Sequence, residues 1–135
     1  MMGTAPKIKY VLRHSTPGAL WLLFCPLYVI YKRVGTPAMV PTSGNEHLVE
    51  VAQKIMLNSL EHFVLHITLQ LILVSFITAK QTINLIPTLN LLFIFGRIFF
   101  FIGYPKYRPF GFFLYFIPLL SVMSYVGYRY VRLFL

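Results

Sequence analysis

Apolar residues are concentrated in four long stretches of the chain, separated by short polar segments. Each stretch holds about 19 to 25 residues, enough to cross roughly 30 Å of hydrocarbon at a rise of 1.5 Å per residue. The predicted spans cover residues 12–31, 55–79, 83–104 and 110–128. Because lipid offers no hydrogen-bond partners to the backbone, such spans must be helical. The pattern therefore predicts an all-α fold, an integral membrane four-helix bundle.

The segments between the stretches differ in length. The first connection, residues 32–54, is long and holds Gly35, Pro37, Pro41 and Gly44, which are typical of loops. A tight turn is expected near residues 80–82, and a short basic loop at 105–109. Four spans put both termini on one side of the membrane, and the Lys and Arg residues are too evenly shared between the two sides to fix the orientation. We predict a single domain over residues 1–135.

Composition agrees with a lipid environment. The chain is 58% hydrophobic and 17% aromatic, and its 12 Lys and Arg face three acids, which gives a net charge of +9. The cations lie in ones and twos at the ends of apolar stretches, which favours anionic head groups or a small anionic ligand over nucleic acid. Cys25 is the single cysteine, so a disulfide framework and a cysteine metal site are both excluded.

Arg97 is the only charge in the apolar stretch from Leu89 to Tyr104. A cation within a membrane span costs about 3 kcal/mol on insertion scales and is usually retained for a partner or a ligand. Phe100 and Tyr104 follow Arg97 at spacings of three and seven residues, so all three lie on one helix face. This face is a candidate binding surface.

A second polar face is predicted on the span before it. Lys54, Asn58 and Glu61 are spaced i, i+4 and i+7, which places them on one side of a helix. Glu61 and Arg97 both lie about 10 Å from the same membrane surface at 1.5 Å per residue. A Glu61–Arg97 ion pair is therefore possible, either within one chain or across a subunit interface.

Two interpretations of that pair remain open. It could simply hold helices together. Alternatively it could belong to a ligand site, because Arg33, Lys106 and Arg108 lie toward the same end of the bundle. A basic opening that ends at a buried carboxylate and amide suits a small polyanion that also carries an amine or amide.

Two histidines are candidates for other chemistry. His62 and His66 have the i, i+4 spacing that can chelate a metal from one helix face. No Cys, Asp or further His lies at comparable depth, so interhelical hydrogen bonding is the favoured interpretation and no metal is expected. Gly96 and Gly103 are expected to permit close helix contact rather than to bind phosphate.

Two segments resemble the MAPEG family, the membrane-associated proteins of eicosanoid and glutathione metabolism. EVAQKIMLNSLEHF, residues 50–63, is similar to the family's motif of a basic residue, Asn and Glu on its second helix. GRIFFFIGYPKYRPFG, residues 96–111, is similar to its third-helix Arg followed by Gly-Tyr and a basic loop. The resemblance implies four transmembrane helices, a homotrimer in an endomembrane such as the endoplasmic reticulum or Golgi, and glutathione bound between subunits.

The resemblance also assigns roles to individual residues. Glu61 would bind the amine of the peptide and Arg33 a ligand carboxylate, while Arg108 would be the catalytic group that stabilises the thiolate. The full glutathione site that it implies consists of Arg33, Lys54, Asn58, Glu61, Arg97 and Tyr104.

Three positions depart from the family pattern, and the chain most resembles the divergent, mattrin-like branch. Phe100 stands where several members carry Tyr or His, His62 where some carry Tyr, and Lys54 where Arg is usual. A lysine gives a point charge instead of the two-pronged contact of arginine. Three functions stay open: a glutathione transferase or peroxidase acting on a lipophilic electrophile, a non-catalytic protein binding a lipid or partner protein, and a channel or transporter subunit.

Overall fold

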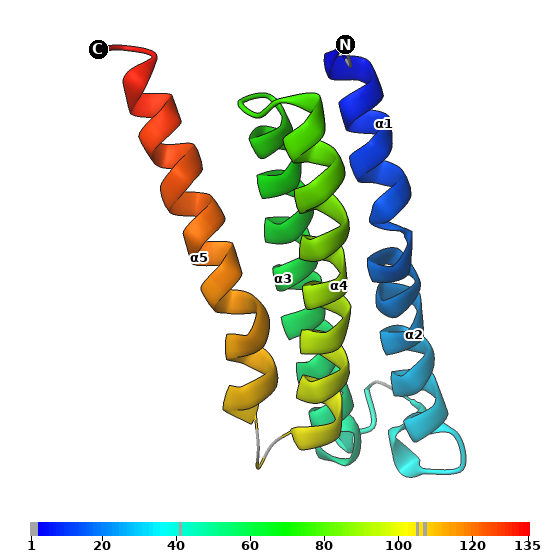
Figure 1. Ribbon diagram of the computed structural model, residues 1–135. Coiled ribbons are helices and arrows are strands. Elements are labelled where there is room, and N and C mark those ends of the chain that lie inside the picture. The colour runs from blue at the N-terminus through cyan, green and yellow to red at the C-terminus, as the bar shows by residue number, and fades with distance from the viewer. Residues whose placement is uncertain (1–2, 41, 105, 107) are drawn as a thin grey trace.

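The computed structural model describes residues 3–40, 42–104, 106 and 108–135, with the backbone alone at Arg108. Every regular element in these residues is helical, which confirms the all-α prediction. The long helices are α1 (Thr4–His14), α2 (Thr16–Arg33), α3 (Glu50–Val74), α4 (Ala79–Gly103) and α5 (Arg108–Arg132). α1 and α2 follow one another along one side of the helix bundle, and both termini lie at the same end of it (Figure 1).

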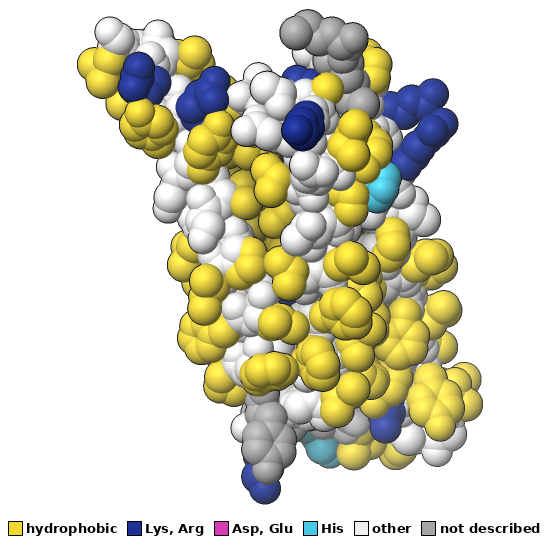
Figure 2. Space-filling model, viewed as in Figure 1, with side chains coloured by type: hydrophobic (Ala, Val, Ile, Leu, Met, Phe, Trp, Pro, Cys, Tyr) yellow, Lys and Arg dark blue, Asp and Glu magenta, His cyan; other side chains and the backbone are white. Residues whose placement is uncertain are grey.

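Among the described residues, three helical segments are long and apolar enough to cross a membrane, Glu46–Val74, Ala79–Gly103 and Pro109–Arg132. Hydrophobic side chains cover the flank of the bundle, whereas Lys and Arg side chains gather toward its ends (Figure 2). This distribution is that of an integral membrane protein, because the apolar flank is the part that contacts hydrocarbon.

α1 and α2 replace the continuous span predicted over residues 12–31. The helix breaks at Ser15, whose hydroxyl donates to the carbonyl oxygen of Val11 at 2.8 Å. Pro17 lies in the first turn of α2, a position that proline favours because no helical donor is lost there. α1 therefore ends at His14 and α2 begins anew.

The turn between α3 and α4 lies earlier than the sequence indicated. It occupies residues 75–78, and residues 80–82 already belong to the first turn of α4. The reason is a capping box: the Thr78 hydroxyl accepts from the amide of Gln81 at 3.3 Å, and the Gln81 side chain accepts from the amide of Thr78 at 3.0 Å. These bonds satisfy two donors at the helix start and fix where it begins.

Pro87 in α4 creates a contact with α1. Pro87 has no amide hydrogen, so the carbonyl of Ile83 loses its usual helical donor. The hydroxyl of Tyr10 donates to that carbonyl oxygen at 3.3 Å. α1 thereby satisfies a group that the proline leaves free.

α4 and α5 make a close backbone contact at two glycines. A Cβ atom added to Gly96 would lie 3.1 Å from the carbonyl oxygen of Gly111, and one added to Gly111 would lie 2.7 Å from the Cα atom of Phe100. Backbones that approach so closely leave no room for a side chain. The predicted role of Gly96 in helix contact is confirmed.

The connection between α2 and α3 contains two short 3₁₀ helices, η1 (Pro37–Met39) and η2 (Glu46–Val49). Gly35 and Gly44 adopt positive φ values of 75° and 81°, which side chains disfavour and glycine tolerates. The loop folds back against the ends of α2 and α3, so it lies beside the candidate site.

Candidate functional site

The centre of the candidate site is a hydrogen bond between α3 and α4. Nη1 of Arg97 donates to Oδ1 of Asn58 at 2.5 Å. Arg97 is fully buried, and its guanidinium lies against the rings of Phe93 and Phe100, 6.0 and 4.9 Å from their centroids. Asn58 is half-buried. The bond fixes the asparagine amide, because its oxygen is held by the arginine.

Glu61 does not join this pair. Its side chain is exposed, and no ion pair links it to Arg97 in the described residues. The possible Glu61–Arg97 pair within one chain is therefore not formed. The reason is helix rotation: α3 turns Asn58 toward α4, and the carboxylate three residues later faces outward. Arg97 has no exposed surface, so this arrangement does not present it to a neighbouring copy either.

Lys54 and Tyr104 lie at the same end of the bundle. Lys54 is exposed and forms an ion pair with Glu50, one turn before it on α3. It also interacts electrostatically with Tyr104, whose ring lies 5.2 Å from that of Phe100. The structure thus places Lys54 near Tyr104, and Tyr104 beside the residue that packs on Arg97.

Arg33 is held by the loop that follows it. Its two terminal nitrogens donate to both carboxylate oxygens of Glu46, at 2.6 and 2.7 Å, and Nη1 also donates to the carbonyl of Ala38 at 2.6 Å. Gln53 donates to the same carboxylate at 2.7 Å. The hydrogen bonds to Glu46 raise the pKa of Arg33. A ligand carboxylate would have to displace Glu46 to reach this arginine.

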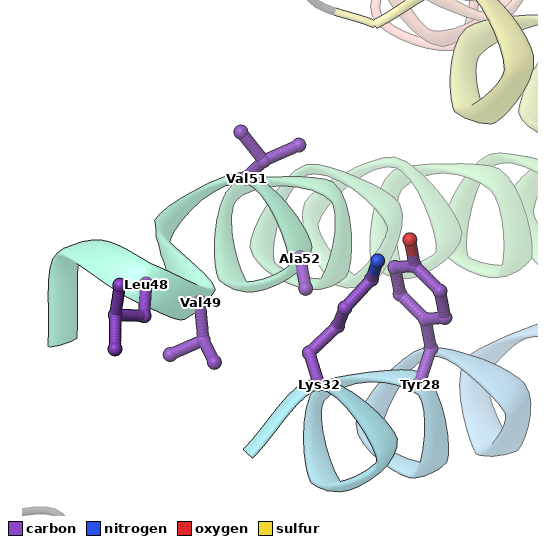
Figure 3. A pocket seen from close by; sticks show the side chains of 6 residues that line it. All are labelled: Tyr28, Lys32, Leu48, Val49, Val51 and Ala52. Carbon is purple, nitrogen blue, oxygen red and sulfur yellow. The ribbon is translucent and has the colours of Figure 1, made fainter. Parts of the chain in front are cut away.

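A cavity of about 150 Å³ lies between the end of α2 and the start of α3. The side chains of Lys32 and Tyr28 point from α2 toward α3 near Ala52 (Figure 3). The Lys32 ammonium lies 5.3 Å from the centre of the Tyr28 ring. Sequence reasoning missed this pair, although its i, i+4 spacing at the end of a span was a signal for it. The predicted thiolate-stabilising residue, Arg108, has a side chain outside the described part of the structure.

A buried polar network crosses the middle of the bundle. His66 on α3 bonds through Nδ1 to the hydroxyl of Tyr115 on α5, and through Nε2 to Oδ1 of Asn90 on α4 at 2.9 Å. Asn90 in turn donates to Oε1 of Gln70 at 2.7 Å. Four buried polar side chains thus satisfy one another across three helices, which confirms interhelical hydrogen bonding for His66. Asn90 and Tyr115 were not among the predicted residues; Asn90, a lone amide in an apolar run, was the available signal.

His62 has a different environment. It is buried, its ring lies edge-on to Phe112 at 5.2 Å, and its Nδ1 has no hydrogen-bond partner among the residues that the structure describes. No group of three or more possible metal ligands occurs among the described residues.

Comparison with known proteins yields one match. The model of the MAPEG family matches residues 14–128, which is most of the chain. Neither curated proteins nor solved structures gave a significant match. The matched region contains α2 to α4 complete and most of α5, and with them every residue of the candidate site.

Proposed function

The chain belongs to the MAPEG family of membrane proteins, and from this premise we propose that it binds glutathione at the end of the bundle where Lys54, Asn58 and Tyr104 lie. The family serves glutathione and eicosanoid metabolism, so a glutathione-dependent transferase or peroxidase acting on a lipophilic electrophile is the activity we propose. The bound tripeptide would be the polar reactant, and the bilayer would supply the lipophilic one.

The hydrogen bond between Arg97 and Asn58 is the observation that carries this proposal. Because Oδ1 of Asn58 accepts from the arginine, the amide nitrogen is left to donate outward to a carbonyl or carboxylate of the peptide. Arg97 itself has no exposed surface, so it acts as a positioning residue through Asn58. A buried charge fixes such an amide firmly, since hydrogen bonds to ionised groups are the strong ones.

Lys54 and Arg33 differ in how readily each would exchange its acidic partner for a ligand carboxylate. Both side chains of the Lys54–Glu50 pair are exposed, and exposed ion pairs contribute little net stability. A glutathione carboxylate can therefore replace Glu50 at Lys54 with little loss. Arg33 carries a two-pronged bond to Glu46, so it would join the site only after the loop has moved.

Glu61 supports a site shared between copies of the chain. Its carboxylate is exposed on the flank of a helix that spans the membrane, where a charge facing lipid is costly. In a homotrimer a neighbouring copy would cover it, and the ammonium of glutathione would pair with it. We therefore place the peptide between subunits, in an endomembrane of the cell.

In catalysis the thiolate of glutathione would attack the electrophile, and a positive group near sulfur would raise the thiolate fraction. Arg108 is the residue we propose for this role, because it begins α5 at the same end of the bundle as Tyr104.

Calorimetric titration of the purified protein with glutathione tests the proposal. We expect binding in the micromolar to millimolar range. Lys54→Gln should weaken it, whereas Lys9→Gln at the opposite end of the bundle should leave it unchanged. Absence of heat, together with no competition by glutathione sulfonate at millimolar concentration, would show the proposal to be wrong.

One observation favours a second function, a non-catalytic protein that binds a lipid or a partner protein. Phe100 lies between Arg97 and Tyr104, is 2% exposed and has no hydrogen-bond donor. A site that binds glutathione in calorimetry yet shows no turnover with any electrophile would support this alternative.

A further inference from the structure

The Arg97 guanidinium is fully buried, but one of its edges is not satisfied. Phe93 and Phe100 lie against the group, and Nη1 donates to Asn58. The remaining nitrogens, Nε and Nη2, are buried and have no hydrogen-bond partner in the described residues. Together Nε and Nη2 form the side of a guanidinium that holds one acceptor between two N–H groups.

His62 is a second buried polar group within electrostatic reach of Arg97. It follows Asn58 by one turn of α3, so the two side chains project from the same helix face. His62 is 5% exposed, and its Nδ1 is the third buried side-chain nitrogen without a partner in the described part of the chain. Arg97 acts on it electrostatically. Three unsatisfied buried nitrogens thus belong to two residues, Arg97 on α4 and His62 on the face of α3 that carries its partner Asn58.

No carboxylate of the same chain neutralises Arg97. The chain has three acidic residues. Glu46 bonds to Arg33 and Glu50 pairs with Lys54, whereas Glu61 is exposed on the outer side of α3. A buried charge that has neither a counterion nor a full set of hydrogen bonds is strongly disfavoured. The site therefore calls for a group that accepts several N–H bonds and carries one negative charge.

We propose that Nε and Nη2 of Arg97 and Nδ1 of His62 form an enclosed site for a small monovalent anion, a halide such as chloride. The neutral His62 ring with its proton on Nδ1 supplies the third donor. A halide suits the place better than a carboxylate, because Arg97 and Phe93 are 0% and Phe100 is 2% exposed. A water molecule would accept these bonds as well but would leave the charge uncompensated. The site is independent of whether glutathione binds.

Thermal unfolding at matched ionic strength tests this proposal. The purified protein is exchanged into sodium gluconate, and part of the gluconate is then replaced by chloride or bromide. We expect both halides to raise the melting temperature by several degrees in a saturable way, as a ligand of the native state does. Arg97→Met should abolish the rise and His62→Phe should reduce it. Arg13→Gln, which changes an exposed arginine on α1, should preserve it.

Chloride NMR of the wild-type protein gives a second readout that does not depend on how a variant folds. Binding broadens the chloride-35 line, and bromide should reverse the broadening by competition. Equal melting temperatures in chloride and gluconate together with an unbroadened line would overturn the proposal, and this is also the result that a water-filled site gives. A halide effect that persists in Arg97→Met would overturn it too.

Discussion

Substitution of Gly111 by alanine tests the close backbone contact between α4 and α5. The new Cβ would lie 2.7 Å from the Cα atom of Phe100, 2.8 Å from the carbonyl oxygen of Gly96, and nearer still to the Phe100 amide nitrogen. These are backbone atoms, which cannot rotate away. To bring the nearest of these atoms, the Phe100 amide nitrogen, out to the 3.4 Å of ordinary contact, α4 and α5 must separate by about 1.2 Å.

The magnitude follows from two opposing effects. Overpacking a well-packed interface costs about 1 to 3 kcal/mol, and contact with backbone places this site at the upper end. Replacing a helical glycine by alanine returns about 1 kcal/mol of helix propensity. We therefore expect Gly111→Ala to destabilise the protein by about 2 kcal/mol.

Gly127→Ala is the matched control. It lies in the same helix, and nothing lies within 4 Å of an added Cβ, so only the propensity gain of about 1 kcal/mol remains. The single tryptophan, Trp21, allows unfolding in sodium dodecyl sulfate to be followed by fluorescence. The two variants should differ by about 3 kcal/mol. Equal stability of the two variants would refute the described contact between α4 and α5.

Three further expectations concern the network, the chemistry and the assembly. Tyr115→Phe removes the hydroxyl that bonds to His66 and should cost about 1 to 3 kcal/mol in the same assay, whereas Tyr125→Phe should cost little; equal costs would contradict the network. Conjugation of chlorodinitrobenzene should be weak, and Phe100→Tyr should raise it about 10- to 200-fold through one hydrogen bond to a charged group; strong wild-type turnover would contradict this. Native mass spectrometry in mild detergent should show three copies, and a folded monomer would contradict the trimer.

The helical architecture could be predicted because lipid leaves the chain few choices. An apolar run long enough to cross a bilayer must form a helix there, so hydropathy alone indicated α3, α4 and α5. Hydropathy does not indicate where a helix begins, however. The start of α4 depends on the hydrogen bonds between Thr78 and Gln81. The break at Ser15 depends on a local side-chain bond and on Pro17 in the first turn of α2.

The sequence predicted how deep in the membrane the site residues lie, but not which of them pair. Residue spacing places Asn58 and Glu61 at similar heights on α3, and either could have met Arg97. Which one does depends on the rotation of α3 about its axis, which is set by its packing against the neighbouring helices. Tyr115 was missed for another reason: it lies in an aromatic run, GFFLYF, where one more aromatic residue gives no contrast.

Glutathione affinity measured across a double-mutant cycle of Arg97→Met and Asn58→Leu tests the central claim most directly. If Arg97 serves the ligand by holding the Asn58 amide, the double variant should lose no more affinity than Asn58→Leu alone. Circular dichroism and size exclusion would check that each variant remains folded. Losses that add would contradict the claim, because they would show that Arg97 contacts the ligand independently, and a wild-type protein without affinity for glutathione would contradict it altogether.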